Sequence, residues 1–487
     1  MTMKLNDPSL LCQQAFVAGE WIHADEGATV AVHNPATGEQ IGTVPLCGAA
    51  ETKRAIAAAE TAQRDWARRP AKERTAILRK LNDLMLANQD DLALIMTTEQ
   101  GKPLAEAKGE IVYAASFIDW FADEARRVYG DTIPAPLADR RILALKQPIG
   151  VTAAITPWNF PTAMLTRKAG PALAAGCSMV VKPATQTPYS ALAFALLADR
   201  AGLPKGLLSV LTGSASKIGG EMTASPIVRK LTFTGSTEVG RMLMKQSADT
   251  IKKLSLELGG NAPFIVFDDA DLDAAVEGAM ISKYRNTGQT CVCANRIYVQ
   301  KGVLAAFTDK LVARVQALKV GNGVEPGVTQ GPLIDDKAVA KIEEHVADAV
   351  AKGGKVLTGG KRHALGGLFY EPTVVAGATP DMLVAHEETF GPLAPIFAFD
   401  TEADAIALAN DTEFGLASYF YSRDIGRIMR VAEQLESGMV GVNTGLISTA
   451  EAPFGGVKQS GLGREGSKYG LDEFLEIKYV CLAGLDK

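Results

Sequence analysis

The chain contains 487 residues, of which 47% are hydrophobic and 22% charged, and its formal net charge is −5. This is an ordinary globular composition, which excludes a disordered, collagen-like or disulfide-stapled chain. At about 150 residues per domain, the length predicts two to four domains. No block of basic residues is present, so we expect neither a nucleic acid nor a membrane surface as a partner.

We find no metal-binding motif and no secretory signal in the sequence. The six cysteines have no C-x-x-C spacing, and the five histidines form no H-E-x-x-H motif. The N-terminal segment MTMKLNDPSLLCQQ lacks the apolar core of a secretory signal. No window approaches the roughly 18 consecutive apolar residues of a membrane span. We therefore expect a cytoplasmic protein that binds no metal.

The first part of the chain is predicted to be helical. Apolar residues recur at steps of three and four over residues 49–100, and the pattern resumes at 110–130 after Gly101 and Pro103. Residues 138–148 alternate partly between apolar and polar. They predict an extended strand on the outside of the body.

From residue 151 onward, short apolar runs alternate with helices. The predicted strands lie in IGVTAAITPWNFP, CSMVVKPA, LLSVLTG and VRKLTFTGS. Such alternation indicates a parallel sheet covered by helices. A second series of the same kind starts at NAPFIVF and runs to GMVGVNT. We expect two α/β domains, each built around a sheet.

Three segments suggest a nucleotide site, although each also has an ordinary explanation. In LTFTGSTEVG a strand runs into Gly235 and Ser236, where a helix start can face a pyrophosphate; G-x-G-x-x-G is absent, and such glycine turns are common. Lys182 ends a buried strand and can reach a ribose or a phosphate, or it is simply solvated. In EETFGP, Glu388 can bind a ribose diol and Phe390 can lie against a ring, or the loop is merely acidic and solvated.

Two segments suggest catalysis. Glu257 lies between leucines in LELGGNAP, where an apolar surround should raise its pKa and make it a general base, unless its end reaches water. Cys291 follows a glycine-containing turn in RNTGQTCVCANR. A nucleophilic thiol needs access and a lowered pKa, whereas most free cysteines are small buried hydrophobes. Cys293 points to the opposite face if this part is extended.

Together, these segments resemble the aldehyde dehydrogenase superfamily. LELGGNAP and the Gly-Gln-Thr-Cys box lie 34 residues apart, and TPWNFP, KPA, FTGST, EETFGP and FGGVKQSGLGREG follow in the family's order. The resemblance covers about residues 16–480. GPALAAG, GQTCVCANR and GLGREGSKYG look like bacterial succinate-semialdehyde dehydrogenases, and glutarate-semialdehyde dehydrogenases are very similar.

The resemblance implies an α/β aldehyde dehydrogenase fold in three parts. A Rossmann-like cofactor-binding domain would comprise residues 1–130 and 150–257, and an α/β catalytic domain residues 258–454. A small β oligomerisation element would join 131–149 to 470–487. Family members are dimers or tetramers, so we expect a homodimer or a homotetramer.

The resemblance also implies roles for single residues. Cys291 matches the nucleophile, Glu257 the general base, and Asn159 the amide that stabilises the oxyanion. The matched cofactor contacts are Thr156, Pro157, Trp158, Lys182, Ala184, Thr185, Gly235, Ser236, Leu258, Glu388 and Phe390. No metal is needed for this chemistry.

Further positions bear on substrate, cofactor and redox preference. Arg167, Arg285 and Ser448 match residues that hold a substrate carboxylate, and Cys293 matches a redox partner of Cys291 in some relatives. Thr185 stands where many NAD-specific relatives carry a glutamate, which would repel a 2′-phosphate. NADP is therefore the expected cofactor, with NAD also possible.

Three other classes of protein remain as alternatives. A cofactor-free cysteine hydrolase would pair Cys291 with a histidine base, but none of the five histidines lies in a recognisable catalytic motif. A noncatalytic protein on the same scaffold would not need both Cys291 and Glu257. An acylating, coenzyme A-dependent dehydrogenase would not need the base that Glu257 supplies.

Overall fold

A computed structural model describes residues 3–485. The expected cofactor-binding domain begins at residue 1 and the expected oligomerisation element ends at residue 487, so residues 1–2 and 486–487 of these ranges lie outside the described residues. The first of two large sheets has eight strands. In spatial order they are β2 (Glu20–Ile22), β1 (Ala15–Val17), β9 (Leu208–Val210), β8 (Ser178–Lys182), β7 (Val151–Ile155), β10 (Val228–Thr234), β11 (Lys253–Glu257) and β21 (Gly461–Leu462). The five strands from β9 to β11 are parallel, as the alternating pattern predicts, and antiparallel strands close both edges.

Helices cover both faces of this sheet. On one face lie α5 (Ala163–Ala175) and α6 (Pro188–Ala201), and on the other α1 (Ala49–Arg68), α7 (Ala215–Ala224) and α8 (Thr237–Ser247). Successive residues of β8 alternate between the two cores: Met179 and Val181 pack toward α5 and α6, and Val180 toward α1. An outer layer over α5 and α6 consists of α2 (Ala71–Ala87), α3 (Gln89–Gln100) and α4 (Leu104–Glu124).

The second sheet has seven strands. In spatial order they are β14 (Lys355–Thr358), β15 (Thr373–Ala378), β16 (Leu393–Phe399), β13 (Ala294–Gln300), β12 (Ala262–Val266), β18 (Ala417–Tyr421) and β19 (Met439–Val442). All neighbours are parallel except β14. One face packs on α9 (Leu272–Tyr284) and α10 (Leu304–Gln316), and the other on α11 (Asp336–Ala351), α13 (Glu402–Asn410) and α14 (Ile425–Gln434).

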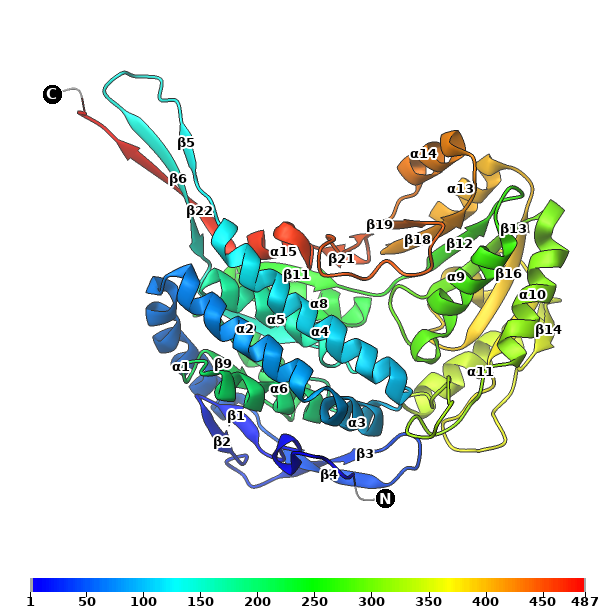
Figure 1. Cartoon of the computed structure of the whole chain (residues 1–487), viewed down its shortest axis with the longest axis horizontal. Helices are drawn as coiled ribbons and strands as arrows, with labels where there is room; N and C mark the ends of the chain where they lie inside the picture. Colours follow the sequence, from blue (N-terminus) through cyan, green and yellow to red (C-terminus); the bar gives the residue numbers. More distant parts are fainter. Residues whose placement is uncertain (1–2, 486–487) are drawn as a thin grey trace.

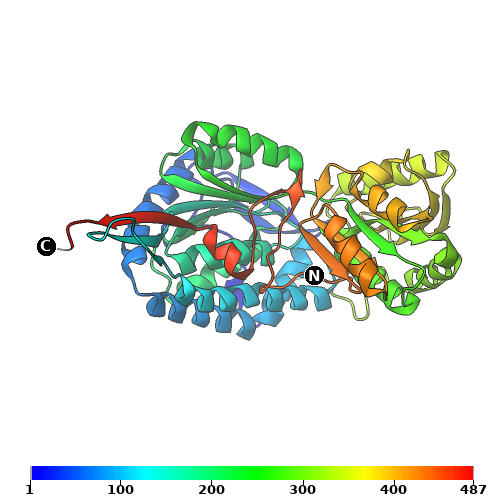
Figure 2. The ribbon, with the colours of Figure 1, turned by 90° about the horizontal axis from the view of Figure 1, so that it is seen from above.

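A third, three-stranded sheet projects from the body (Figures 1 and 2). It consists of β5 (Asp131–Ile133), β6 (Arg141–Pro148) and β22 (Leu475–Leu482). β6 and β22 pair antiparallel over their whole length, so the extended segment predicted from the sequence does join the C-terminal strand. The short helix α15 (Ser467–Asp472) leads into β22. Two small two-stranded sheets, β3 (Thr29–His33) with β4 (Gln40–Pro45) and β17 (Phe414–Gly415) with β20 (Val457–Lys458), complete the strands.

The two large sheets meet end to end. β11 ends at Glu257 and β12 begins at Ala262, so the chain leaves the carboxyl edge of the first sheet and enters the amino edge of the second. Connections run outward from β7 to both sides of the first sheet, and ligands of open α/β sheets bind at such a switch point, outside the carboxyl ends of the strands. Among residues 3–485, no helix combines the length and the apolarity that a bilayer crossing requires.

Candidate active site

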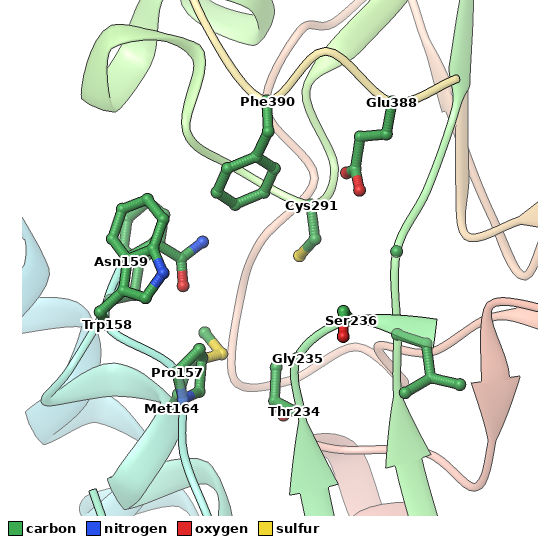
Figure 3. Close-up of a pocket in the computed structure, with 13 residues that line it drawn as sticks. Pro157, Trp158, Asn159, Met164, Thr234, Gly235, Ser236, Cys291, Glu388 and Phe390 are labelled. Atoms are coloured by element: carbon green, nitrogen blue, oxygen red, sulfur yellow. The ribbon is translucent and has the colours of Figure 1, made fainter. Parts of the chain in front are cut away.

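A cavity of about 240 Å³ lies where the two sheets meet (Figure 3). The first sheet contributes loops from the carboxyl ends of β7, β10 and β11, and the second contributes loops that precede β13 and β16. The lining residues are Pro157, Trp158, Asn159, Phe160, Met164, Thr234, Gly235, Ser236, Leu258, Gly259, Cys291, Glu388 and Phe390. Nine of the residues singled out in the sequence therefore face one space.

Backbone geometry brings Cys291 into this cavity. After α9, three successive residues adopt left-handed conformations, with φ of 52° at Asn286, 57° at Thr287 and 76° at Gly288. A Cβ on Gly288 would lie 2.2 Å from the Gly391 carbonyl oxygen, so only glycine fits there. The amide of Cys293 donates to the Thr290 carbonyl at 3.0 Å, which makes 290–293 a turn rather than an extended segment.

The Cys291 thiol is accessible but not activated in this state. Burial raises the pKa of Cys291 to about 12, while the positive charges of Arg167 and Arg285 oppose that rise. Glu388 and Glu257 add to it. The thiol therefore needs a proton acceptor before it can attack.

Hydrogen bonds fix Asn159 through both its side-chain amide and its backbone carbonyl. Its side-chain Nδ2 donates to the Gln289 carbonyl at 3.0 Å, which leaves the second amide hydrogen for a ligand. Its own carbonyl accepts from Lys102 Nζ at 2.7 Å and from Asn286 Nδ2 at 3.0 Å. Lys102 is in turn paired with Glu110 at 2.5 Å. The amide is thus fixed relative to the loop that carries Cys291.

Glu257 is a buried carboxylate without hydrogen bonds. It is 3% exposed, and neither oxygen has a hydrogen-bond partner among the described residues. Burial raises the pKa of Glu257 well above its usual value, and the nearby Glu465 raises it further. The rise expected from the sequence is confirmed, and the alternative in which the carboxylate reaches water is not observed. Glu257 does not line the cavity itself; its chain neighbour Leu258 does.

The aromatic and glycine residues form a cradle at the mouth of the first sheet. Trp158 and Phe390 meet edge to face, with ring centroids 5.6 Å apart. A Cβ on Gly235 would lie 2.4 Å from the Phe233 ring, so glycine leaves the backbone open where α8 begins. The Ser236 hydroxyl caps α8 by accepting from the Val239 amide at 3.4 Å.

The polar groups around this cradle form few hydrogen bonds with the protein. Glu388 accepts one hydrogen bond, from the Gly260 amide at 3.3 Å, and burial raises the pKa of Glu388 to about 8. The buried Thr156 hydroxyl has no partner among the described residues. A helix N-terminus at an open backbone, a singly bonded carboxylate and an orphaned hydroxyl fit a nicotinamide dinucleotide, whose pyrophosphate and sugars need such groups.

Lys182, Ala184 and Thr185 lie outside the lining of the cavity. Lys182 Nζ donates to the Pro183 carbonyl at 2.8 Å and to Thr185 Oγ1 at 3.3 Å. Burial lowers the pKa of Lys182 to about 8. The lysine is therefore not the freely solvated side chain that the sequence also allowed.

The three substrate candidates differ in their surroundings. Arg167 is buried, and its Nε lies 3.3 Å from Glu465, so it has the acidic neighbour that a structural arginine would have. Arg285 forms no ion pair with a described carboxylate and lies 5.3 Å from the centre of the Phe160 ring. Ser448 is half-buried in the loop after β19.

Sequence reasoning assigned no role to several residues at the site. Phe160, Thr234 and Glu465 lie inside motifs quoted above, so only their roles were missing, whereas Lys102, Glu110 and Lys168 gave no local signal. Lys168 donates to Glu465, which is 297 positions away in the chain, and to Thr234 Oγ1 at 2.6 Å. Such partners become visible only after folding.

The comparisons with known proteins agree with this geometry. The model of the aldehyde dehydrogenase family matches residues 21–480. The chain belongs to the aldehyde dehydrogenase family. It is 69% identical to the glutarate-semialdehyde dehydrogenase of Pseudomonas aeruginosa over 99% of this chain and 100% of the relative. It is 64% identical to the NADP(+) succinate-semialdehyde dehydrogenase GabD of Escherichia coli, with the same coverage.

Solved structures of the family have the same fold. The succinate-semialdehyde dehydrogenase of Burkholderia pseudomallei superposes with a TM-score of 0.98 at 68% identity, over 98% of this chain and 99% of the other. The protein is therefore an oxidoreductase with the α/β aldehyde dehydrogenase fold. Within residues 3–485, no group of three or more His, Cys, Asp or Glu side chains is arranged to hold a metal ion.

Proposed function

We propose that this aldehyde dehydrogenase oxidises succinate semialdehyde to succinate with NADP, and with NAD more weakly, in the breakdown of 4-aminobutyrate. The observation that carries the proposal is the convergence of the Cys291 thiol and the Asn159 amide on one cavity, with Arg285 nearby and unpaired. An unpaired guanidinium suits a substrate that has a carboxylate at its far end. The similarity to the NADP(+) enzyme of Escherichia coli supports both substrate and cofactor.

The residues of the chain divide the chemistry into two steps. In the first, the Cys291 thiolate attacks the aldehyde carbon while the oxyanion accepts hydrogen bonds from the Asn159 side chain and the Cys291 amide. Such donors contribute roughly 3–4 kcal/mol each. The bound nicotinamide cofactor supplies the hydride acceptor. In the second step, Glu257 takes a proton from water, which hydrolyses the thioester on Cys291.

The cofactor would be held by the cradle described above. Gly235 and Ser236 would face the pyrophosphate, Lys182 and Glu388 the two riboses, and Phe390 the nicotinamide end. The remaining proposed contacts are Thr156, Pro157, Trp158, Ala184, Thr185 and Leu258. Placing Glu388 against a diol would give its buried carboxylate the hydrogen bonds it lacks.

Glutarate semialdehyde is the second candidate substrate. It differs from succinate semialdehyde by one methylene, and the glutarate-semialdehyde dehydrogenase of Pseudomonas aeruginosa is 69% identical to this chain. One methylene in a pocket is worth only about 1–3 kcal/mol, so both substrates are expected to react.

Steady-state kinetics test these proposals directly. Succinate semialdehyde, glutarate semialdehyde, butanal and pentanal are each oxidised with NAD and with NADP, and kcat/KM is compared. We expect both semialdehydes to exceed the uncharged aldehyde of equal length by at least tenfold. Equal efficiencies for charged and uncharged aldehydes would rule out the carboxylate specificity, and a strong preference for NAD would rule out the cofactor assignment.

We also propose a domain assignment and an assembly. The body around the first sheet (1–130 and 150–257) would bind the cofactor, and residues 258–454 would carry the nucleophile. The projecting sheet (131–149 and 470–487) would join subunits into a homodimer or homotetramer, since its outward side chains Ile477 and Tyr479 are 73% and 65% exposed. A cytoplasmic location is proposed because all six cysteines are free and the nucleophile is a thiol.

A further inference from the structure

The hydroxyl of Tyr113, in the middle of α4, is buried without a hydrogen-bond partner among the described residues. A buried tyrosine hydroxyl usually finds a partner, because leaving it unsatisfied costs stability. Tyr113 was not singled out by any motif, and nothing in the mechanism above uses it. An orphaned hydroxyl of this kind is available to a group that a ligand brings.

The side chains around Tyr113 belong to the proposed substrate site. Its ring meets Phe117 edge to face, with centroids 5.0 Å apart, and the Arg167 guanidinium lies 5.4 Å from the same Phe117 ring. The pKa of Tyr113 is raised by burial and by the charge of Glu465, and it is lowered by the charges of Arg167 and Arg285 and by the nearby Ser448 hydroxyl. The same two arginines act on the pKa of Cys291. The hydroxyl, the two guanidiniums and the nucleophile therefore share one neighbourhood.

Several hydrogen-bond donors in this neighbourhood have no partner among the described residues. Arg167 Nε and Nη2 are also buried without a hydrogen bond, although Nε lies 3.3 Å from Glu465. Arg285 forms no ion pair with a described carboxylate. The surrounding surfaces are apolar, since the Arg167 guanidinium stacks at 3.7 Å on Phe454 and Arg285 lies over Phe160. The unpaired guanidinium groups and the Tyr113 hydroxyl outnumber the one carboxylate near them, Glu465, so this site among phenylalanine rings can accept one further anionic group.

We propose that Tyr113 is a specificity-determining residue whose hydroxyl donates to the distal carboxylate of the semialdehyde, beside Arg167 and Arg285. A carboxylate has two oxygens and about four acceptor positions, which one arginine cannot fill. The proposal rests on the proposed function, because it assumes that the substrate carries this carboxylate. It adds a neutral donor that selects for the anion without adding charge near the Cys291 thiolate.

Tyr113→Phe tests the proposal, since it removes only the oxygen. We expect kcat/KM for succinate semialdehyde to fall about tenfold, the effect of losing one hydrogen bond to a charged group. The value for butanal should change less than twofold. The Ki of the product succinate as a competitive inhibitor should rise by a similar factor, which measures binding without chemistry. The melting temperature should not fall, because the hydroxyl has no protein partner to lose.

Tyr189→Phe is the matched control. The Tyr189 hydroxyl is also part-buried, but it lies 3.5 Å from the Thr43 carbonyl, away from the cavity. Its removal should leave the preference for semialdehydes intact. The assignment is wrong if Tyr113→Phe lowers kcat/KM equally for succinate semialdehyde and butanal. It is also wrong if the variant leaves both values and the Ki of succinate unchanged. A wild-type enzyme that shows no preference for semialdehydes would instead refute the proposed function, and the two failures are distinguishable.

Discussion

At the scale of single residues, Arg285 and Arg167 are not equivalent. Arg285 is held by the Phe160 ring and by no described carboxylate, whereas Arg167 lies against Glu465, which itself acts on the pKa of Glu257. Charge at Arg285 is therefore available to a ligand. The charge of Arg167 also lowers the pKa of Glu257, the proposed base.

Arg285→Ala should act mainly on the substrate carboxylate, although it also removes one of the charges that lower the pKa of Cys291. Removing a charge-assisted hydrogen bond of roughly 1.5–3 kcal/mol should lower kcat/KM for succinate semialdehyde about ten- to a hundredfold. Butanal should be little affected. Arg167→Ala should lower the rates of both aldehydes, because it also removes the partner of Glu465. Equal losses for both aldehydes in Arg285→Ala would mean that Arg285 supports the fold or the thiol instead.

Thr185→Glu should reverse the cofactor preference. Thr185 Oγ1 lies 3.3 Å from Lys182 Nζ, so a glutamate there would pair with the lysine and repel a 2′-phosphate. The ratio of kcat/KM for NADP to that for NAD should fall at least tenfold. Thr185→Ser should keep the wild-type ratio because it keeps the hydroxyl. An unchanged ratio in Thr185→Glu would show that Thr185 does not select the cofactor; capping of the following helix is not its role, because the N-cap of α6 is Thr187.

Cys293 lies on the other side of the 290–293 turn from the cavity. Its Sγ donates to the Lys283 carbonyl of α9 at 3.2 Å, whereas Cys291 faces the cavity. A Cys291–Cys293 disulfide therefore requires the 290–293 turn to open, since the sulfurs must come within bonding distance.

Peroxide inactivation tests whether that opening occurs. We expect dithiothreitol to restore most activity to oxidised wild type but little to oxidised Cys293→Ala, whose lone thiol oxidises beyond recovery. Cys47→Ala is the control, because Cys47 is buried away from the cavity. Equal recovery of wild type and Cys293→Ala would exclude the Cys291–Cys293 bond as the switch.

At the scale of elements, the strands of the projecting sheet are held by their pairing with one another more than by packing on the body. β22 is paired with β6 along its whole length, yet most of its side chains are exposed, including Ile477 and Tyr479. Exposed apolar residues on a projecting strand are typical of an interface between subunits.

Ile477→Asp should therefore weaken assembly. We expect the mass from light scattering to shift from an oligomer toward the 51.5 kDa monomer, with the far-UV circular dichroism unchanged. Leu365→Asp, in an exposed loop of the second body, should leave the mass as in wild type. An unchanged oligomer for Ile477→Asp would move the interface elsewhere on the molecule.

At the scale of the whole molecule, one site is shared by two bodies. Loops of the first sheet supply the cradle, and loops of the second supply Cys291, Glu388 and Phe390. A dinucleotide bound in the cavity would contact both and so oppose their unfolding.

Cofactor binding should consequently raise the melting temperature. NADP at a hundred times its Kd should add about 2.7 kcal/mol to the free energy of unfolding. Glu388→Gln should reduce the shift at the same concentration, because an amide accepts only through one oxygen. A melting temperature that does not depend on NADP concentration would contradict the nucleotide site.

The sequence by itself determined the class of fold and the order of the motifs. Hydrophobic periodicity is local, so the strands ending in Lys182 and Thr234 could be located, and parallel strands place their carboxyl ends at one edge. The short strands β1 to β4 gave no such signal, because β1 has only three residues and β2 to β4 are partly exposed without a regular alternation.

Only the tertiary structure decided which groups are paired and which are left free. Lys168 with Glu465, and Lys102 with the Asn159 carbonyl, join segments that are distant in the chain. The same packing buries the Tyr113 hydroxyl without a partner and leaves Arg285 without a carboxylate. Hydrogen bonding and burial depend on which surfaces meet in space, and no local pattern of residues encodes that.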